Sequence, residues 1–452
     1  MAKIVDMTKG RAFKLILAFS IPLAISAMVQ QLYSFVDALI VSLSLGAEVA
    51  TGVNLTGSIT FLFNGITSGL ASGFGVLLAK FVGAGDNNSL KKGLANAITL
   101  CVIIGLTIAV VGVLTTQPVL RLLGTDQKYM PFAVEYLACI YVGALFTMLY
   151  NLAKQVLTSL GDSRTPLVIL FVSAAINLGL DCLMFLPGFT VGWAAWATVI
   201  SQGVSAIIAF GIVLTRFPAI RPKLSDFRLL PKMSLSLLGI GMPMAIQFAI
   251  TAAGTMIQQS AFNALGPDVA MAQGAGSRVD GIFICAYWGV ALTMATYAGQ
   301  NYGARNAQRL KQGFRDSLLV GAIYVGIFMS LGLIFARVFP VLLLPGQSEE
   351  IYDIATKYVR TQALFHVFLM ALYLSREPVQ AMGMSGAAML CGVAELIARG
   401  VAALTFLPLF GAEAAGFSNP LAWASGALVG MIIQAIRLKA LTKEFGAEPK
   451  LE

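Results

Sequence analysis

Residues 93–116 read GLANAITLCVIIGLTIAVVGVLTT, a run without a single charged side chain. About 20 consecutive apolar residues are enough for a helix to cross the hydrocarbon core of a bilayer. Runs of this kind recur along all 452 residues, so that apolar types make up 58% of the chain. Charged residues make up only 11%, against about 25% in soluble domains. The sequence therefore predicts an all-α polytopic membrane protein.

Charged residues, glycines and prolines divide the chain into twelve predicted transmembrane helices. Their approximate ranges are 13–45, 50–82, 93–116, 130–160, 165–187, 193–215, 233–264, 268–301, 314–337, 351–383, 388–410 and 418–438. Several ranges are longer than a bilayer requires, which indicates tilt, bending or extension into water. Pro22, Pro243 and Pro378 lie inside three of the ranges, where each removes one backbone hydrogen bond.

Lysine and arginine are concentrated in alternate connections, and the densest group lies at 216–232. Positively charged loops stay on the cytoplasmic side. This pattern predicts that both termini of the multi-pass chain are cytoplasmic. The net charge of +9 is then mainly a topology signal, and we expect no nucleic-acid partner.

Other function classes find no support in the sequence. The five cysteines lie in apolar stretches without C-x-x-C spacing, and His366 is the only histidine. A disulfide framework and a zinc site are therefore not indicated. No nucleophile and base are arranged for catalysis, so we expect no enzymatic activity and no cofactor.

The two halves of the chain resemble each other at an offset of about 220 residues. Matching pairs are Pro22 with Pro243, Gly83-Ala84 with Gly303-Ala304, and Gly161 with Gly383. We predict two pseudo-symmetric six-helix lobes, an N-lobe at 1–215 and a C-lobe at 233–452, joined by a cytoplasmic linker at 216–232. Parallel repeats of this kind carry substrate sites at or beside their interface.

Ionisable residues inside the predicted helices mark a candidate site. Asp37 lies late in the first helix, and Asn177 and Asp181 lie four apart in the fifth, on one helical face. A charge in lipid costs about 2.5–3.5 kcal/mol on insertion scales, so such residues are usually functional. The three side chains could hold a proton, Na⁺ or a cationic substrate. The alternative is that Asp181 only forms hydrogen bonds near a helix end.

The remaining polar residues favour structural roles. Glu395 and Arg399 have the spacing of an intrahelical ion pair. Arg278 and Asp280 are two apart, cannot face each other, and are expected to pair with other helices. His366 could titrate near neutral pH, although a single buried histidine is more often hydrogen-bonded packing.

At this point the chain resembles the multidrug and toxic compound extrusion (MATE) family over nearly its whole length. The resemblance rests on Ile21-Pro22, Val36-Asp37, Lys80-Phe81-Val82-Gly83-Ala84-Gly85-Asp86, Gly161-Asp162-Ser163-Arg164-Thr165-Pro166, Asn177-x3-Asp181 and Gly299-Gln300-Asn301-Tyr302-Gly303-Ala304. It implies an antiporter with two six-helix lobes that exports amphipathic, often cationic, compounds against H⁺ or Na⁺ by rocker-switch alternating access.

The resemblance also implies site residues. It assigns Asp37, Asn177 and Asp181 to an N-lobe cation site, which would be the site for Na⁺ if sodium is the coupling ion. We further predict that Gln30, Tyr33, Gln247 and His366 line the substrate cavity. The seventh-helix acid of NorM-like members is replaced here by Gln247, so the site resembles that of DinF-like bacterial members, with coupling in the N-lobe. The resemblance also implies that the multi-pass chain lies in the plasma membrane, the inner membrane of a bacterium.

Two other functions remain alternatives. A lipid-linked oligosaccharide flippase of the same superfamily would require a basic cavity, for which Lys154, Arg278, Arg376 and Arg399 are available. A channel is less well supported, because no filter loop is repeated. The expected partners are a small-molecule substrate and membrane lipid, and we expect a monomer.

Overall fold

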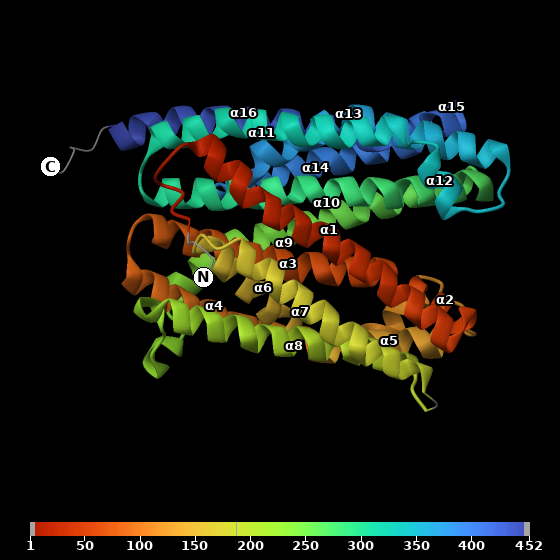
Figure 1. Cartoon of the computed structure of the whole chain (residues 1–452), viewed down its shortest axis with the longest axis horizontal. Helices are drawn as coiled ribbons and strands as arrows, with labels where there is room; N and C mark the ends of the chain where they lie inside the picture. The colour runs from red at the N-terminus through yellow and green to blue at the C-terminus, as the bar shows by residue number, and fades with distance from the viewer. Residues whose placement is uncertain (1–4, 187, 447–452) are drawn as a thin grey trace. The chain divides into compact units, whose positions relative to one another are not determined.

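The computed structural model describes residues 5–186 and 188–446. The predicted helix end at Pro187 and the chain ends at 1–4 and 447–452 lie outside the described residues. In the described part, helices follow one another without strands (Figure 1). By packing, the chain forms two units, one of Val5 and Val29–Ala245, the other of Asp6–Met28 and residues 246–446.

The first unit contains the helices of the amino-terminal repeat. They are α2 (Ala47–Leu55), α3 (Gly57–Gly83), α4 (Asn87–Leu122), α5 (Met130–Val142), α6 (Ala144–Ser159), α7 (Arg164–Asp181), η1 (Cys182–Phe185) and α8 (Val191–Arg216). Helix α6 packs against α3, α4 and α8. Helices α5 and α6 form one span that bends by 53° at Gly143.

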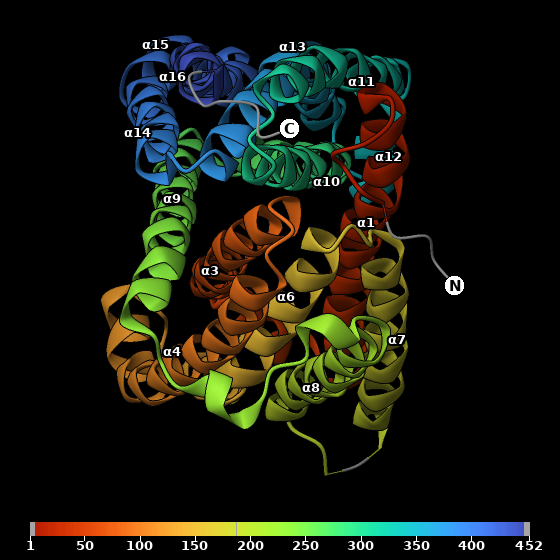
Figure 2. The ribbon, with the colours of Figure 1, turned by 90° about the vertical axis from the view of Figure 1, so that its left-hand side faces the viewer.

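The second unit repeats this arrangement. Its helices are α10 (Pro267–Gly303), α11 (Ala307–Ile334), α12 (Val338–Leu343), α13 (Glu349–Ala381), α14 (Ser385–Val401), η4 (Ala402–Phe406), α15 (Leu407–Phe410), η5 (Gly411–Phe417) and α16 (Ser418–Gly446). Helix α13, the counterpart of α6, packs against α10, α11, α14 and α16. Figure 2 shows α10, α11, α13 and α16 nearly along their axes.

Two long helices, α1 (Ala12–Leu45) and α9 (Pro231–Ala264), each contribute one half to each unit. The predicted lobes follow the repeats, whereas the packing units exchange the first halves of these two helices. Pro22 and Pro243 lie within these first halves, and both helices continue through them.

Small residues explain why these halves pack as they do. In the first unit, a Cβ on Gly73 of α3 would lie 2.6 Å from the backbone nitrogen of Gly241 in α9. One turn away, a Cβ on Gly69 would lie 2.8 Å from Cα of Ala245. In the second unit, a Cβ on Gly289 of α10 would lie 2.6 Å from Cα of Ala24 in α1. Small residues spaced four apart allow helix backbones in membranes to approach this closely.

The predicted repeat is confirmed by the backbone between the helices. Gly161 and Gly383 have nearly the same positive φ, +87° and +89°, a conformation that favours glycine. The N-caps of α4 and α11 also correspond, since Asp86 accepts from the Ser89 N–H at 2.9 Å and Asn306 accepts from the Arg309 N–H at 3.0 Å. Each half therefore builds the same helix connections.

The twelve predicted helices have counterparts among the described residues, in places broken into two pieces. Nine of these segments, or ten with the bent α5–α6 pair, are long and apolar enough to cross a membrane by composition alone, with 385–445 counted as one. Helix α13 lies outside this set because it carries many polar side chains, which are mostly buried in the second unit.

The linker at 216–232 is tied to α4 of the first unit. Its backbone binds Asn96, which accepts from the Leu230 N–H at 2.8 Å, and Lys91 pairs with Asp226 at 3.6 Å. The hydrogen bond from the Lys223 N–H, 2.7 Å long, lowers the pKa of Asp226 below its usual range. The linker is thus held along the first unit rather than hanging free.

Candidate functional site

The first unit encloses a polar cavity of about 410 Å³. Helices α1, α3, α5, α6 and α8 surround it. Its lining residues are Gln30, Tyr33, Ser34, Asp37, Thr60, Phe63, Asn64, Ser68, Tyr136, Ile140, Thr147, Tyr150, Asn151, Lys154, Thr198 and Gln202. Gln30, Tyr33 and Asp37 reach it from one face of α1, because their spacing of three and four residues follows the helical turn.

Asp37, a lining residue of this cavity, contacts Asp181, which lies behind it. Their carboxyl groups are in hydrogen-bonding contact, and one oxygen of Asp37, Oδ1, is buried without a hydrogen-bond partner among the described residues. Asp181 is fully buried and is the last residue of α7. Two carboxylates in contact repel each other unless a cation or a proton lies between them. The pair is therefore arranged to gain or lose one positive charge.

Asn177 joins the same cluster through Thr198. Its amide nitrogen lies 3.4 Å from the Thr198 hydroxyl, which is also hydrogen-bonded to the Tyr33 hydroxyl. Asn177 is fully buried, one turn before Asp181 on α7. The three residues predicted as a cation site thus lie in one hydrogen-bonded cluster beside the cavity, and Asp37 alone of the three lines it.

Lys154 lies on the same cavity, on α6. Its ammonium group stands 4.2 Å from the ring centroid of Tyr150, a cation–π contact. No carboxylate of the described residues lies within 4.0 Å of it. The cavity wall therefore includes Asp37 of the acidic pair and also Lys154, which the sequence offered only for the basic cavity of the flippase alternative.

Gln247 and His366, the other two predicted cavity residues, belong to the second unit and do not line this cavity. His366 is fully buried, with Nε2 2.6 Å from Asp280 and Nδ1 3.1 Å from the Tyr287 hydroxyl. Gln247 accepts a hydrogen bond from Gln380 at 2.5 Å. These contacts fit the hydrogen-bonded packing that was the alternative for His366.

A buried ionic cluster also lies in the second unit. Glu395 contacts Arg399 at 3.3 Å and Arg376 at 3.3 Å, and Arg376 contacts Glu377 at 3.1 Å. The predicted Glu395–Arg399 pair is confirmed. Glutamates thus pair with both arginines, so that Arg376 and Arg399, two of the four residues named for a basic cavity, lie in a compensated cluster.

The expectation for Arg278 and Asp280 is half correct. Asp280 pairs with His366 on another helix, but Arg278 is exposed and makes no ion pair among the described residues. Their positions two apart place them on different faces of α10, one buried and one outward. A snorkelling arginine at the surface of a bundle does not require a partner.

Comparison with known proteins identifies the family. The MatE family profile matches residues 22–183 and again residues 243–405. The chain belongs to the MatE family. The two matched segments begin at Pro22 and Pro243, the pair of prolines that the repeat had predicted to correspond.

Relatives of this MATE chain are named as a multidrug resistance protein and as a transporter. It is 30% identical to the probable multidrug resistance protein YpnP of Bacillus subtilis over 318 residues, which cover 68% of this chain and 69% of YpnP. It is 25% identical to an FAD transporter of Shewanella oneidensis over 323 residues, which cover 70% of each chain.

Solved structures share the fold. An outward-facing multidrug resistance MATE transporter of the MOP superfamily matches with a TM-score of 0.91 at 21% identity, over 98% of this chain and 100% of the other. A MATE protein in complex with MaL6 matches with a TM-score of 0.89 at 22% identity over the same shares. The chain is thus a multi-pass member of a multidrug efflux family.

Proposed function

We propose that this MATE chain is a secondary active antiporter of the plasma membrane that exports amphipathic organic compounds in exchange for H⁺. The observation that carries the proposal is the contact between Asp37 and Asp181 at the wall of a substrate-sized cavity. One proton shared by the pair removes the repulsion between the two carboxylates.

Exchange follows from competition for this corner of the cavity. Protonation of the Asp37–Asp181 pair removes the negative charge that attracts a cationic compound, whereas release of the proton restores it. If the protonated and substrate-bound forms prefer opposite members of two alternating conformations, a proton gradient drives export. The rocker-switch motion of the two lobes belongs to this proposal.

The test is efflux of a cationic dye from proteoliposomes under an imposed pH gradient, a sodium gradient, or neither. We expect the pH gradient to drive efflux in the wild type, and Asp37→Asn and Asp181→Asn each to reduce it about tenfold or more, since each removes a group that takes part in proton transfer. Glu48→Gln is the control, because Glu48 is an exposed acid of the same unit that pairs with Lys128.

Dye binding to each purified variant separates loss of coupling from loss of folding. Efflux driven by sodium alone would assign the pair to Na⁺ and overturn the proton assignment. Efflux coupled to pH in both asparagine variants would place the coupling site elsewhere in the chain.

Lys154 favours a second candidate, export of compounds that carry a negative group. A phosphate or carboxylate of a bound compound would compensate the lysine charge in the cavity, where burial strengthens the attraction. The similarity to a protein named as an FAD transporter points in the same direction. Such a substrate would place its anionic group at Lys154 and keep Asp37 for the proton.

Transport assays with FAD and with a cationic dye distinguish the two candidates. If anions are substrates, Lys154→Met should reduce FAD efflux about tenfold or more while leaving dye efflux within about twofold, because only the anion uses the ammonium group. Absence of FAD transport in the wild type would reject this second candidate and leave the first untouched.

A further inference from the structure

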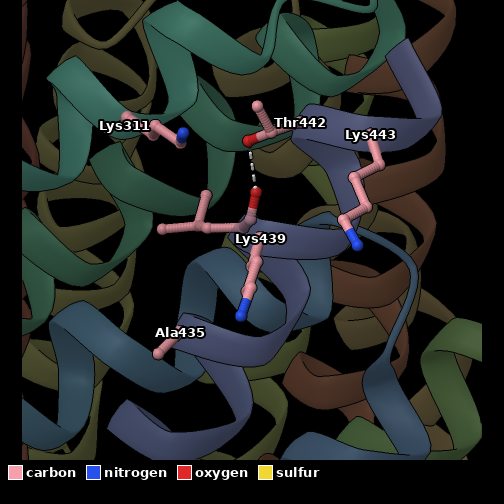
Figure 3. A pocket seen from close by; sticks show the side chains of 6 residues that line it. Lys311, Ala435, Lys439, Thr442 and Lys443 are labelled. Carbon is pink, nitrogen blue, oxygen red and sulfur yellow. Dashed lines mark hydrogen bonds between the residues drawn. The ribbon is translucent and has the colours of Figure 1, made fainter. Parts of the chain in front are cut away.

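A second pocket, of about 360 Å³, lies between α11 and α16 in the second unit. We call it the tri-lysine pocket. It is lined by Lys311, Ala435, Leu438, Lys439, Thr442 and Lys443. Figure 3 shows Lys311 extending from α11 toward α16, and Lys439 and Lys443 leaving α16 one turn apart in a common direction. No part of the proposed transport site contributes to it.

The three lysines of this pocket make no ion pair among the described residues. No carboxylate of the described residues lies within 4.0 Å of the ammonium group of Lys311, Lys439 or Lys443. The neighbouring acid on α16, Glu444, pairs instead with Arg437 at 3.3 Å. Three like charges around one pocket attract an anion, and each ammonium group offers N–H donors to its oxygens.

An apolar surface continues from the pocket along both helices. On α16, Ile436 and Ile432 lie three and seven residues before Lys439 and are 62% and 52% exposed. On α11, Leu318 lies seven residues after Lys311 and is 47% exposed. These spacings keep the apolar residues on the helix faces that carry the lysines. The surface is basic at one end and apolar along its length.

The place of the pocket along the chain fits a membrane surface. Lys311 lies in the first turns of α11, just after the connection from α10, and Lys439 and Lys443 lie near the end of α16. The charge pattern predicts that both segments lie on the cytoplasmic side. The apolar residues then face the acyl chains, while the lysines reach the level of the lipid phosphates.

We propose that the tri-lysine pocket binds the anionic head group of a membrane phospholipid whose acyl chains lie along Ile432, Ile436 and Leu318. Basic pockets between transmembrane helices on the cytoplasmic side bind such head groups. Phosphatidylglycerol and cardiolipin have the required chemistry, a phosphodiester without a compensating amine. Phosphatidylcholine carries a fixed positive charge and does not. This inference is independent of the proposed transport function.

The test measures lipid retained by the full-length protein with native mass spectrometry after titration with phosphatidylglycerol or phosphatidylcholine in detergent. The wild type should retain phosphatidylglycerol about tenfold or more in preference to phosphatidylcholine. The triple variant K311Q/K439Q/K443Q should lose this preference, because each lysine near the surface adds to the attraction for anionic lipid.

The matched control is K14Q/K223Q/K232Q, which removes the same charge from exposed lysines on the same predicted side of the membrane but outside the pocket. If the control loses the preference equally, general charge rather than this pocket holds the lipid. If the triple variant does not fold, Lys439→Gln alone should still reduce retention severalfold.

Competition with inorganic phosphate decides between a lipid and a free anion. Millimolar phosphate should leave bound phosphatidylglycerol in place, because phosphate lacks the apolar contacts. Displacement of the lipid by phosphate, or equal retention of both lipids by the wild type, would overturn the proposal.

Discussion

The close contact between α3 and α9 yields a sharp prediction about stability. Gly73→Ala adds one methyl group at a place where the nearest atoms belong to the backbone of α9. The added Cβ would lie 2.6 Å from the nitrogen of Gly241 and 2.9 Å from the carbonyl carbon of Ile240. Ordinary contacts of this kind are longer than about 3.4 Å, so one helix must move by most of an ångström.

The size of the effect follows from the rigidity of both partners. A side chain could rotate away from the new methyl group, but a helix backbone moves only as a whole. Its movement would also separate Gly69 from Ala245, which are in contact one turn away. Overpacking in a rigid core costs about 1–3 kcal/mol. Alanine is favoured over glycine in a helix by up to about 1 kcal/mol, which offsets part of this cost. We expect a net loss of about 1–2 kcal/mol.

The assay is thermal unfolding of the purified full-length protein in detergent, with wild type and variants heated at one rate, because unfolding of large proteins is often irreversible. A loss of this size lowers the midpoint by about 2–8 °C in a unit of this length. Gly239→Ala is the control, because this α9 glycine has nothing within 4 Å of the added Cβ and should leave the midpoint unchanged or raise it. Equal midpoints for Gly73→Ala and Gly239→Ala would refute the close helix contact.

Two further stability predictions concern the connection before α7. Gly161→Ala and Gly124→Ala both place a side chain at positive φ, +87° and +75°, which costs about 1–2 kcal/mol. At position 161 the new Cβ would also collide with the backbone carbonyl of Val5, whereas at position 124 it meets nothing within 4 Å. Gly161→Ala should therefore lower the unfolding midpoint by several degrees more than Gly124→Ala. Asp162→Ala removes the acceptor of Arg216 at 2.6 Å and of the Thr165 N–H at 2.9 Å. We expect the free energy of unfolding to fall by about 2–3 kcal/mol. Trypsin should then cleave the variant after Arg216 faster than it cleaves the wild type, and equal cleavage rates would contradict the prediction.

Much of the fold could be predicted from the sequence. The length of each apolar run reflects the thickness of the bilayer, and the repeat is visible as matching motifs at a constant offset. The offset between Gly161 and Gly383 anticipated two connections with the same backbone conformation. The exchange of half-helices could not be predicted. It depends on which small residues of different helices are in contact. Nothing in the sequence around Gly69 and Ala245 indicates that these two residues pack against each other.

The candidate site shows the same division. Carboxyl groups in lipid are rare enough that Asp37 and Asp181 stood out before their contact was known. Lys154 was named only for the flippase alternative, because the sequence does not show the rotation of α6 about its axis, which decides whether this side chain lines the cavity. The sequence allowed His366 to be either a cavity residue or a hydrogen-bonded residue of the packed interior. Its contacts with Asp280 and Tyr287, which only the structure shows, favour the second.

The same half-helix exchange bears on how a proton at the proposed site could affect the whole chain. Asp37 lies in the part of α1 that packs in the first unit, while Ala24 and Ser20 of the same continuous helix pack in the second. Ser20 contacts the Tyr324 hydroxyl at 3.1 Å, and Ala24 contacts the Gly289 backbone closely. A change of charge at Asp37 that moves its half of α1 therefore acts on a helix anchored at both ends. In the proposed antiport mechanism, the continuous helix α1 connects Asp37 with Ser20 and Ala24 directly, without a network of side chains.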